Sequence, residues 1–385
     1  MTDKSPLRIS DPTIVSYSAE GESRWGFHQF PALSRLPDGR ILLVYADAED
    51  ASESHGATAP AFVSSDGQEW SPFSGPPQPV RPHFSVTNLG EEALALPASA
   101  YLDTARLGID LPSPVAKTEV YGTLLTYRAD DLPKAVRDDL ATLHGVRYAD
   151  GEWRDVDVKY DMTGRLAWRR EGSTLLPRPF FERSGLVSND EILYPDYRVR
   201  FELPDGRIAP KGSTWLMAST DDGLSFHKRG LVATDPSGHD LHGEPTIAET
   251  KDGGLVCVVR RTDQVQKPMA ITWSKDAGRN WTPAVDLFEF GVFPCLLRLG
   301  SGPLLLSYGR PGVHVGVNRN GDGRVWDSRR TIIPGDHGDV SRHSCGYTSL
   351  LALGPNSALL AYSDFSTPWE STQRKAICVC TIEVD

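Results

Sequence analysis

The sequence of 385 residues predicts an all-β protein, a six-bladed β-propeller with one helical insertion between its second and third blades. Two sets of repeated turns predict this fold, and they run in phase along the chain. A period of roughly 40–50 residues built from hairpins is typical of propeller blades. Because stacked blades share one continuous core, we expect residues 1–385 to form a single domain.

The first set of turns follows the pattern Ser-x-Asp-x-Gly-x-x-aromatic. It is complete at 219–226 and 274–281, one residue short at 64–70, and degraded at 318–326, where Gly321 stands for the glycine. The Ser and Asp side chains can accept hydrogen bonds from nearby backbone amides, the glycine can adopt a positive φ, and the ring can pack beneath the turn. Each copy therefore predicts a tight turn between two strands.

The second set consists of a turn followed by an apolar strand, as in Leu-Pro-Asp-Gly-Arg-Ile-Leu-Leu at 36–43. The turn centres lie near residues 38, 90, 205, 252, 302 and 356. Four of the five intervals between them span 47 to 54 residues, which gives six blades. The long interval leaves about sixty residues over, so we place an insertion at about 129–190, between the second and third blades.

The first part of this insertion has the signals of a helix. The stretch 130–145 starts with aspartates, has Pro133 in its first turn and ends on Gly145. Its apolar residues recur at helical spacing, at positions 132, 136, 140 and 143. The sequence therefore predicts a helix here, inserted in an otherwise all-β chain.

The two ends of the chain carry β-prone runs. One lies at 14–17, before any blade turn, and the other at 376–382. Propellers commonly close their ring by pairing an N-terminal strand with the last blade. We therefore expect these two runs to form such a clasp.

The composition limits the classes of partner. Forty basic and 51 acidic residues give a formal net charge of −11, which disfavours nucleic acid and anionic membranes as partners. The N-terminus has no apolar signal region and no stretch has transmembrane length, so we expect a cytoplasmic location. The five cysteines and the histidines lack metal-ligand spacing, and nothing predicts a metal site, a cofactor or a particular oligomeric state.

Three segments outside the turns complete a resemblance that covers most of the chain. Glu244 precedes a proline, and Arg260 follows 16 residues later, about the distance of one outgoing and one returning strand. Arg310 lies ahead of the degraded fourth turn, and Tyr347 opens the apolar run 346–353. In this order and phase, the chain resembles the sialidase (neuraminidase) superfamily, and its first set of turns looks like the Asp boxes, or BNR repeats, of that superfamily.

The resemblance implies a chemistry. Members of the superfamily are exo-glycosidases that remove a terminal acidic sugar from a glycan, and arginines bind the carboxylate of that sugar. By this resemblance Tyr347 is the nucleophile, Glu244 is its base, and Arg260 and Arg310 bind the substrate carboxylate. A tyrosine nucleophile is a known exception to the usual carboxylate pair of glycosidases. The expected substrate is an acidic glycan or oligosaccharide carrying sialic acid or a uronic-type sugar.

The chain also departs from the family pattern. Gln29 stands where the family has the first of three clamp arginines, and Arg24 lies nearby in sequence as a substitute. The acid/base aspartate is replaced by a segment in which Glu53 is the best candidate, with Asp50 and His55 behind it. These changes leave two alternatives open: a lyase acting on a glycan that contains uronic acid, and a non-catalytic glycan-binding propeller.

Overall fold

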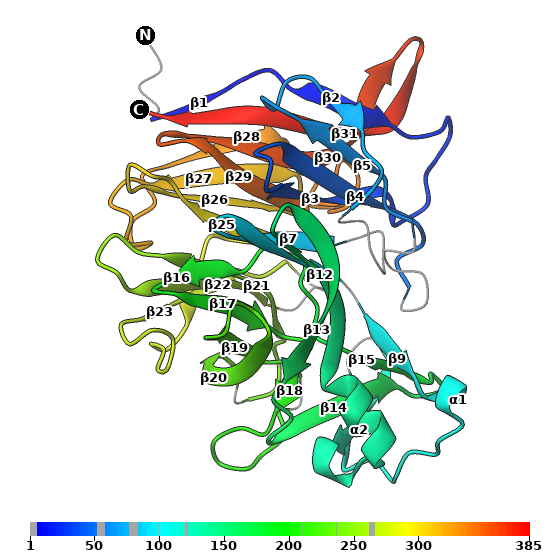
Figure 1. Ribbon diagram of the computed structural model, residues 1–385. Helices are drawn as coiled ribbons and strands as arrows, with labels where there is room; N and C mark the ends of the chain where they lie inside the picture. The colour runs from blue at the N-terminus through cyan, green and yellow to red at the C-terminus, as the bar shows by residue number, and fades with distance from the viewer. Residues whose placement is uncertain are drawn as a thin grey trace.

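The fold is described by a computed structural model for residues 6–51, 58–76, 84–98, 100–119, 122–209, 211–235, 237–261 and 266–385. In these ranges nearly all regular structure is β-strand, which confirms the expected all-β class. None of the helices in these ranges could span a membrane. The strands form small antiparallel sheets that follow one another along the chain (Figure 1).

Three of these sheets consist of four strands that are consecutive in the sequence, in order from the inside outward. The first contains β3 (Phe27–Arg35), β4 (Ile41–Asp47), β5 (Ala61–Ser64) and β6 (Ser71–Pro72). Another contains β21 (His242–Glu249), β22 (Leu255–Arg261), β23 (Met269–Ser274) and β24 (Val285–Leu287). The next contains β25 (Val292–Arg298), β26 (Leu304–Gly309), β27 (Val313–Asn318) and β28 (Ser328–Ile333).

An eight-stranded sheet fills the interval between the first of these sheets and the second. One half contains β7 (Phe84–Leu89), β8 (Glu92–Pro97), β12 (Thr142–Ala149) and β13 (Glu152–Tyr160). The other half contains β16 (Leu186–Ser188), β17 (Glu191–Asp196), β19 (Thr214–Ser219) and β20 (Ser225–Ala233). Among the described residues, strand pairing between the halves is limited to two parallel pairs of β13 and β20, Lys159 with Ser225 and Tyr160 with Phe226. Each half thus repeats the four-strand pattern of the other sheets.

The last sheet contains the two ends of the chain. Its strands are β29 (Thr348–Gly354), β30 (Ser357–Trp369), β31 (Thr372–Val384), β1 (Leu7–Ile9) and β2 (Thr13–Tyr17). Strand β2 pairs antiparallel with β31, with Ile14 opposite Cys378 and Tyr17 opposite Ala376. Strand β1 pairs farther along β31, with Leu7 opposite Val384. The expected clasp between the N-terminal run and the last strand is therefore confirmed.

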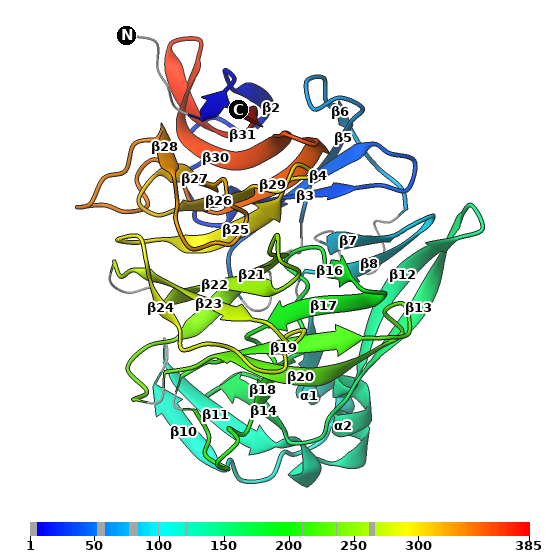
Figure 2. The ribbon, with the colours of Figure 1, turned by 90° about the vertical axis from the view of Figure 1, so that its left-hand side faces the viewer.

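Apolar side chains between neighbouring sheets make up the core. Each sheet or half-sheet shares a buried cluster with the next one along the chain. The last sheet shares a cluster with the first, in which Leu359 and Ile377 lie with Leu33 and Leu43. The sheets therefore form a closed ring, and the turned view shows them side by side (Figure 2). Burial of apolar area in every one of these interfaces stabilises the ring.

A set of side-chain hydrogen bonds also links the innermost strands. In each, a Ser, Thr or Cys side chain of one innermost strand accepts a hydrogen bond from a backbone amide of the next sheet. The pairs are Ser349 Oγ with Leu33 N at 3.0 Å, Ser34 Oγ with Val86 N at 3.2 Å, Thr87 Oγ1 with Gly185 N at 2.8 Å, Thr246 Oγ1 with Leu296 N at 2.9 Å, and Cys295 Sγ with Leu350 N at 3.4 Å. These bonds provide acceptors for backbone amides that face the centre of the ring. They also fix the position of each sheet relative to its neighbour along the axis of the ring.

The inserted part of the chain differs from the expected segment 129–190. Strands β12 and β13 extend the sheet of β8, so 142–160 belongs to the ring. The inserted elements are β9 (Tyr101–Asp103), α1 (Thr104–Leu107), β10 (Ala116–Glu119), β11 (Thr123–Arg128), a 3-10 turn (Ala129–Asp131), α2 (Lys134–Leu140), β14 (Arg165–Arg170), β15 (Leu175–Pro177) and β18 (Arg200–Phe201). They form small sheets with a core of their own at the end of the molecule away from β1 and β31 (Figures 1 and 2).

The expected helix at 130–145 is shorter in the structure. Helix α2 spans Lys134–Leu140, and Leu132, Val136 and Leu140 are buried in the core of the insertion. Residue 143 lies in β12, where its side chain joins the ring core. Strand pairing with β13 overrides the helical spacing there, because the pairing satisfies the backbone amides of β12 in a sheet.

The first set of repeated turns has the expected local structure. Each turn connects the third strand of a sheet to the fourth. In the copy at 274–281, Gly278 has a φ of 80° and donates its amide hydrogen to Ser274 Oγ at 3.0 Å. In the degraded copy, Gly323 and not Gly321 takes this role, donating to Asn318 Oδ1 at 2.9 Å. The longer Asn side chain reaches one glycine farther along the chain.

One member of the second set is out of phase. The turns near 38, 252, 302 and 356 connect the first strand of a sheet to the second, as expected. The turn near 205 instead lies between β18 and β19. In that half-sheet, the first hairpin turns at Asn189 and Asp190, which have φ values of 50° and 61°. The Leu-Pro-Asp-Gly signal specifies a turn but not its place in the sheet.

Candidate functional site

The predicted site residues from the second half of the chain meet at one end of the ring. Glu244 lies near the start of β21, Arg260 near the end of β22, and Arg310 directly after β26, while Tyr347 directly precedes β29. Because neighbouring strands are antiparallel, the start of a first strand and the end of a second strand lie at the same edge. We call Glu244, Arg260, Arg310 and Tyr347 the site floor.

Glu244 is the centre of the site floor. The Tyr347 hydroxyl donates a short hydrogen bond to Glu244 Oε1, and Arg260 Nη1 donates to the same oxygen at 2.6 Å. The other carboxylate oxygen accepts the backbone amide of Phe293 at 2.9 Å. Glu244 and Arg260 are both buried. This arrangement fixes the orientation of the carboxylate toward the phenol of Tyr347.

Bulges in the innermost strands place these side chains. Phe30, Glu244 and Phe293 each precede a proline and have positive φ values of 56°, 45° and 44°. At each position the strand register shifts against its neighbour. A bulge re-aims a side chain, and a positive φ outside glycine is strained, so such positions persist where the surrounding structure enforces them. The repetition in three sheets shows that the bulges are a common feature of this edge.

The electrostatics define the resting protonation states of Glu244 and Tyr347. Burial by itself raises the pKa of Glu244, but the charge of Arg260, the Tyr347 hydroxyl and Arg310 hold this pKa below its ordinary value. Burial and the nearby Glu244 charge raise the pKa of Tyr347 well above its ordinary value. Glu244 is therefore an ionised acceptor, and Tyr347 is a neutral phenol that needs this acceptor to become a nucleophile.

Arg310 borders Tyr347 on another side. Its Nε and Nη2 donate to the carbonyl oxygen of Cys345 at 3.2 and 3.1 Å, and its guanidinium carbon lies 5.5 Å from the centre of the Tyr347 ring. Gly346, with a φ of 74°, allows this contact: a Cβ atom there would lie 2.5 Å from the Arg310 amide nitrogen. The glycine before Tyr347 thus brings the arginine and the phenol together.

Aromatic rings enclose Tyr347. The ring of Phe293 stacks on it with centroids 4.1 Å apart and an angle of 8°, and Phe30 lies 4.8 Å away. The ring centre of Trp25 lies 5.9 Å from that of Phe30 and 5.1 Å from the guanidinium carbon of Arg310. Such rings exclude water from the phenol and offer a surface for the apolar face of a sugar.

Sequence reasoning missed a second group of residues at the same edge. We call Glu182, Arg183, Tyr197 and Arg198 the site wall. The Tyr197 hydroxyl donates to Glu182 at 3.3 Å, and the Arg183 guanidinium lies 3.6 Å from the ring centre of Phe293. The Tyr197 ring packs on Gly243, next to Glu244, where an added Cβ would lie only 2.9 Å from it. The segments 178–185 and 197–202 have no repeat signal, so no pattern in the sequence indicated this group.

A cavity of about 220 Å³ lies in the centre of the ring, next to this site. The innermost strands β3, β21, β25 and β29 line it, and so do Glu182, Arg183 and Tyr197 of the site wall. Floor and wall together contain four arginines, at 183, 198, 260 and 310, and two glutamates, at 182 and 244. This set has an excess of positive charge in a protein whose formal net charge is −11.

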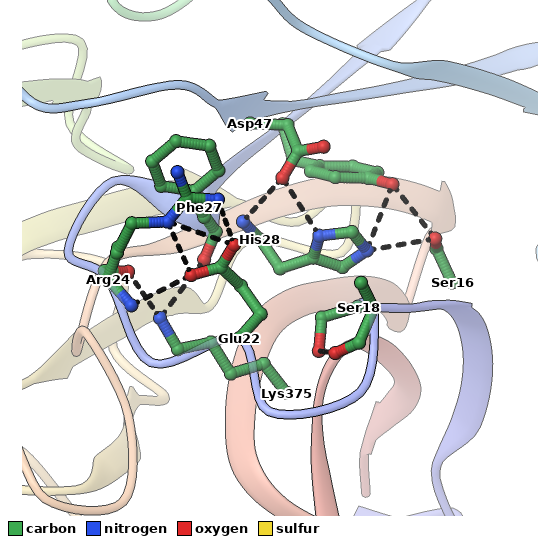
Figure 3. A network of polar contacts seen from close by, with 10 residues as sticks. Ser16, Ser18, Glu22, Arg24, Phe27, His28, Asp47 and Lys375 are labelled. Carbon is green, nitrogen blue, oxygen red and sulfur yellow. Dashed lines mark hydrogen bonds and ion pairs between the residues drawn. The ribbon is translucent and has the colours of Figure 1, made fainter.

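Gln29 and Arg24, the two other predicted substrate-binding residues, do not join this set. Gln29 is fully buried, and its amide atoms have no hydrogen-bond partner among the described residues. Arg24 is largely exposed and donates from Nε to Glu22 at 3.0 Å, while its guanidinium stacks on Phe27 (Figure 3). Glu53 and His55 lie outside the described residues. Asp50, the other candidate, accepts the indole hydrogen of Trp25 at 3.0 Å.

A Ser-His-Asp arrangement lies near Arg24 (Figure 3). His28 Nδ1 lies 3.0 Å from Asp47 Oδ1, and its Nε2 lies 3.2 Å from Ser16 Oγ. The Ser16 hydroxyl is also 2.8 Å from the hydroxyl of Tyr45, and both His28 and Tyr45 are buried. Ser16 belongs to β2 and the other three residues to β3 and β4. The network therefore links the clasp strand to the first sheet.

The described residues contain no group of three or more His, Cys, Asp or Glu side chains that could hold a metal ion. Among them, His242 is buried with Nδ1 unbonded, and burial together with the charge of Arg261 lowers its pKa to about 4. His242 is therefore neutral at physiological pH.

Comparison with known proteins gives one match in sequence and many in structure. No protein-family model matches the chain. Over 146 residues it is 29% identical to sucrose-6-phosphate hydrolase of Bacillus subtilis, covering 36% of this chain and 28% of that enzyme. The match therefore spans little more than a quarter of the length of that relative.

The similar structures cover nearly the whole chain. A protein of unknown function from Dyadobacter fermentans has a TM-score of 0.63 at 17% identity, covering 99% of this chain and 100% of that chain. The family 93 alpha-L-arabinofuranosidase of Fusarium graminearum, in complex with arabinobiose, has a TM-score of 0.57 at 15% identity, covering 96% of this chain and 97% of that chain. A Hadza microbial sialidase has a TM-score of 0.54 at 14% identity, covering 95% of this chain and 68% of that chain. The chain thus shares its overall fold with these solved structures.

Proposed function

We propose that the protein is a glycoside hydrolase that removes a terminal acidic sugar, a sialic acid or a uronic-type sugar, from a glycan. The observation that carries this proposal is the contact of the Tyr347 hydroxyl with Glu244, whose carboxylate is held by Arg260 and the Phe293 amide. A phenol aimed at an ionised, immobilised acceptor is the arrangement that an activated nucleophile needs. The surplus of arginines around it supports an anionic substrate.

The reaction then follows from the geometry. Arg260 and Arg310 bind the carboxylate of the sugar and orient its anomeric carbon toward Tyr347. The Tyr347 oxygen attacks this carbon and forms a new C–O bond, its proton passes to Glu244, and the bond to the leaving oxygen breaks as that oxygen takes a proton from an acid. Water then attacks the anomeric carbon while the deprotonated acid takes its proton, the bond to Tyr347 breaks, and Glu244 returns its proton to the Tyr347 oxygen, so the sugar leaves with its configuration retained. We assign the acid to the segment with Glu53 and His55.

The choice of a tyrosine suits an acidic sugar. When the anomeric centre lies beside a carboxylate, a carboxylate nucleophile would meet a like charge. A phenol is neutral until its proton leaves, and Glu244 next to it takes this proton without approaching the sugar. This reasoning favours a sugar whose anomeric carbon bears the carboxylate, as in sialic acid, over a neutral one such as the arabinobiose bound by the Fusarium relative.

The same proposal covers the architecture. We infer that the ring is a single-domain propeller of six blades, because the eight-stranded sheet divides into two four-strand halves that join only at β13 and β20. We infer that the Ser-x-Asp turns are Asp boxes, since three of them bond the glycine amide to a serine hydroxyl between the third and fourth strands. The insertion then lies mainly within the second blade.

The test is release of sugar from three fluorogenic substrates in parallel: an aryl sialoside, an aryl uronide and a neutral aryl arabinofuranoside. The proposal expects turnover of one of the acidic substrates and little or none of the neutral one. Absorbance near 235 nm, an approximate wavelength for a conjugated unsaturated uronide, separates the lyase alternative, in which Tyr347 removes a proton beside the carboxylate. Binding of the acidic sugars without turnover would support the glycan-binding alternative, and preference for the arabinofuranoside would refute an acidic substrate.

A further inference from the structure

The backbone at Arg198 is held rigidly by residues from two parts of the molecule. Asp196, at the end of β17, accepts the amide hydrogens of Arg198 at 2.6 Å and Val199 at 3.0 Å. From the insertion, the indole nitrogen of Trp168 donates to the carbonyl oxygen of Arg198 at 2.9 Å. A surface loop does not need such support, whereas a residue that must hold a ligand does.

The guanidinium of Arg198 lies between rings and without a carboxylate partner. Its central carbon is 4.9 Å from the ring centre of Phe180 and 4.7 Å from that of Tyr197. Its Nε is buried, and among the described residues nothing accepts a hydrogen bond from it. No described carboxylate forms an ion pair with this side chain within 4.0 Å. A partly buried cation that lacks an anion costs free energy unless a ligand supplies one.

Arg198 lies toward the site floor. Tyr197, its neighbour in sequence and in stacking, packs on Gly243 next to Glu244. Tyr347 and Glu182 lie within electrostatic reach of Arg198. Burial opposes the charge of Arg198, but these neighbours and Tyr101 hold its pKa above the ordinary value, so it remains a cation. The side chain is thus a fixed positive charge beside the tyrosine that the proposed reaction uses.

We propose that Arg198 binds the carboxylate of the acidic sugar as a third cation, with Arg260 and Arg310, and that the insertion determines specificity by positioning it through Trp168. This inference rests on the proposed acidic substrate. It also accounts for the uncharged Gln29 in the first sheet, because the missing charge enters from the connection after β17. The insertion then has a function in addition to packing.

The experiment compares wild type, Arg198→Gln, Trp168→Phe and the control Arg207→Gln on an aryl sialoside and on its methyl ester, which lacks the negative charge. Arg207 is an exposed arginine of the same connection, paired with Asp205. For Arg198→Gln we expect KM for the free acid to rise about 10- to 100-fold, the range of a lost charge-assisted hydrogen bond, with little change for the ester. Trp168→Phe should give a smaller rise, and Arg207→Gln no change above about 2-fold.

Tryptophan fluorescence provides a second readout that needs no turnover. Free N-acetylneuraminic acid and glucuronic acid are titrated into each variant, after thermal unfolding has shown that the variant is folded. Weaker binding by Arg198→Gln of an acid that wild type binds supports the inference even if no glycoside is hydrolysed, in which case only the proposed reaction fails. An unchanged preference of Arg198→Gln for the free acid over the ester, or wild type that binds neither acid, would overturn it.

Discussion

The floor and the wall of the site lie in halves of the ring that differ in regularity. The site floor comes from the sheets of β21 to β31, where four-stranded units follow one another at nearly constant spacing. The site wall comes from 182–198, beside an eight-stranded sheet interrupted by the insertion. In the regular half, the distance along the chain determines which residues meet. In the interrupted half, side-chain packing determines which residues meet. The site floor therefore follows from the repeated fold, whereas the site wall depends on the packing of this particular chain.

The largest effect on activity that distinguishes the site floor from the site wall is expected from Tyr347→Phe. Loss of the hydroxyl removes the nucleophile, so kcat should fall by at least about 10³-fold. The ring, which stacks on Phe293 and Phe30, stays in place, and the melting temperature should change little. Steady-state kinetics and thermal unfolding check this, with Tyr308→Phe as a buried tyrosine control. Full activity in Tyr347→Phe would show that Tyr347 of the site floor is not the nucleophile.

Glu244→Gln should lose both activity and stability. Without the acceptor for the phenolic proton, kcat should fall about 10²- to 10⁴-fold. The buried Arg260 also loses its ion pair with Glu244, and breaking such a buried pair costs about 3–5 kcal/mol in the free energy of unfolding. Glu249→Gln, on the same strand but partly exposed, should cost less than about 1 kcal/mol. Urea unfolding measures both, and equal stability of the two variants would contradict the central role of Glu244.

The pH dependence of the wild type follows from the same carboxylate. The folded-state pKa of Glu244 lies below its ordinary value of 4.5. Its contribution to stability is therefore complete above the unfolded-state pKa and is lost as the pH falls through the lower folded-state pKa. The acid limb of kcat/KM that belongs to this base should lie below pH 4.5. An acid limb from this base near neutrality, absent in Glu244→Gln, would contradict this assignment.

The difference between the halves also explains what the sequence could predict. The interval from Glu244 to Arg260 is one hairpin, and Gly243 pairs with Arg260, so sequence distance alone brought the ion pair together. The clasp was predictable because both its strands are β-prone and lie at the chain ends. Arg198 has no such signal, since Trp168 and Asp196, which hold it, come from separate elements.

Local signals failed where their meaning depends on packing. The Leu-Pro-Asp-Gly turn near 205 has the same internal bond as the turn near 38: Leu203 and Leu36 each donate an amide hydrogen to an arginine carbonyl four residues on. Only one of the two opens a sheet, because the neighbouring strands differ. The helical spacing at 130–145 likewise ended early, since β12 found partners in β8 and β13. The chemistry of a turn is local, but the position of that turn within a sheet depends on tertiary packing.

A prediction of intermediate size concerns the wall. Burial raises the pKa of Asp196 from 3.8 to about 6, so the folded protein binds its proton more tightly than the unfolded chain does. Stability from this group is therefore lost as the pH rises between these values. Asp196→Asn keeps the acceptor for the Arg198 amide without the charge, and should be more stable at pH 7.5 by about 3 kcal/mol, with no gain near pH 4. A less stable variant in urea unfolding at pH 7.5 would contradict this.

The smallest effect is expected at Arg24. Its side chain is exposed and paired with Glu22, and such a surface pair contributes little to binding or stability. Arg24→Gln should change KM for an acidic substrate by less than about 2-fold. A selective rise of 10-fold or more would instead make Arg24 the substitute for the missing clamp arginine, and would move the third charge from the wall to the first sheet.

The most direct test of the account is to find the atom that the sugar bonds to. The protein is incubated with a fluorinated glycosyl fluoride of the acidic sugar that it hydrolyses, so that the covalent intermediate accumulates, and the labelled peptide is identified by mass spectrometry. The account predicts one sugar per chain, attached to Tyr347, and none in Tyr347→Phe. A sugar attached to Glu244 or another carboxylate, or turnover without any adduct on Tyr347, would contradict it.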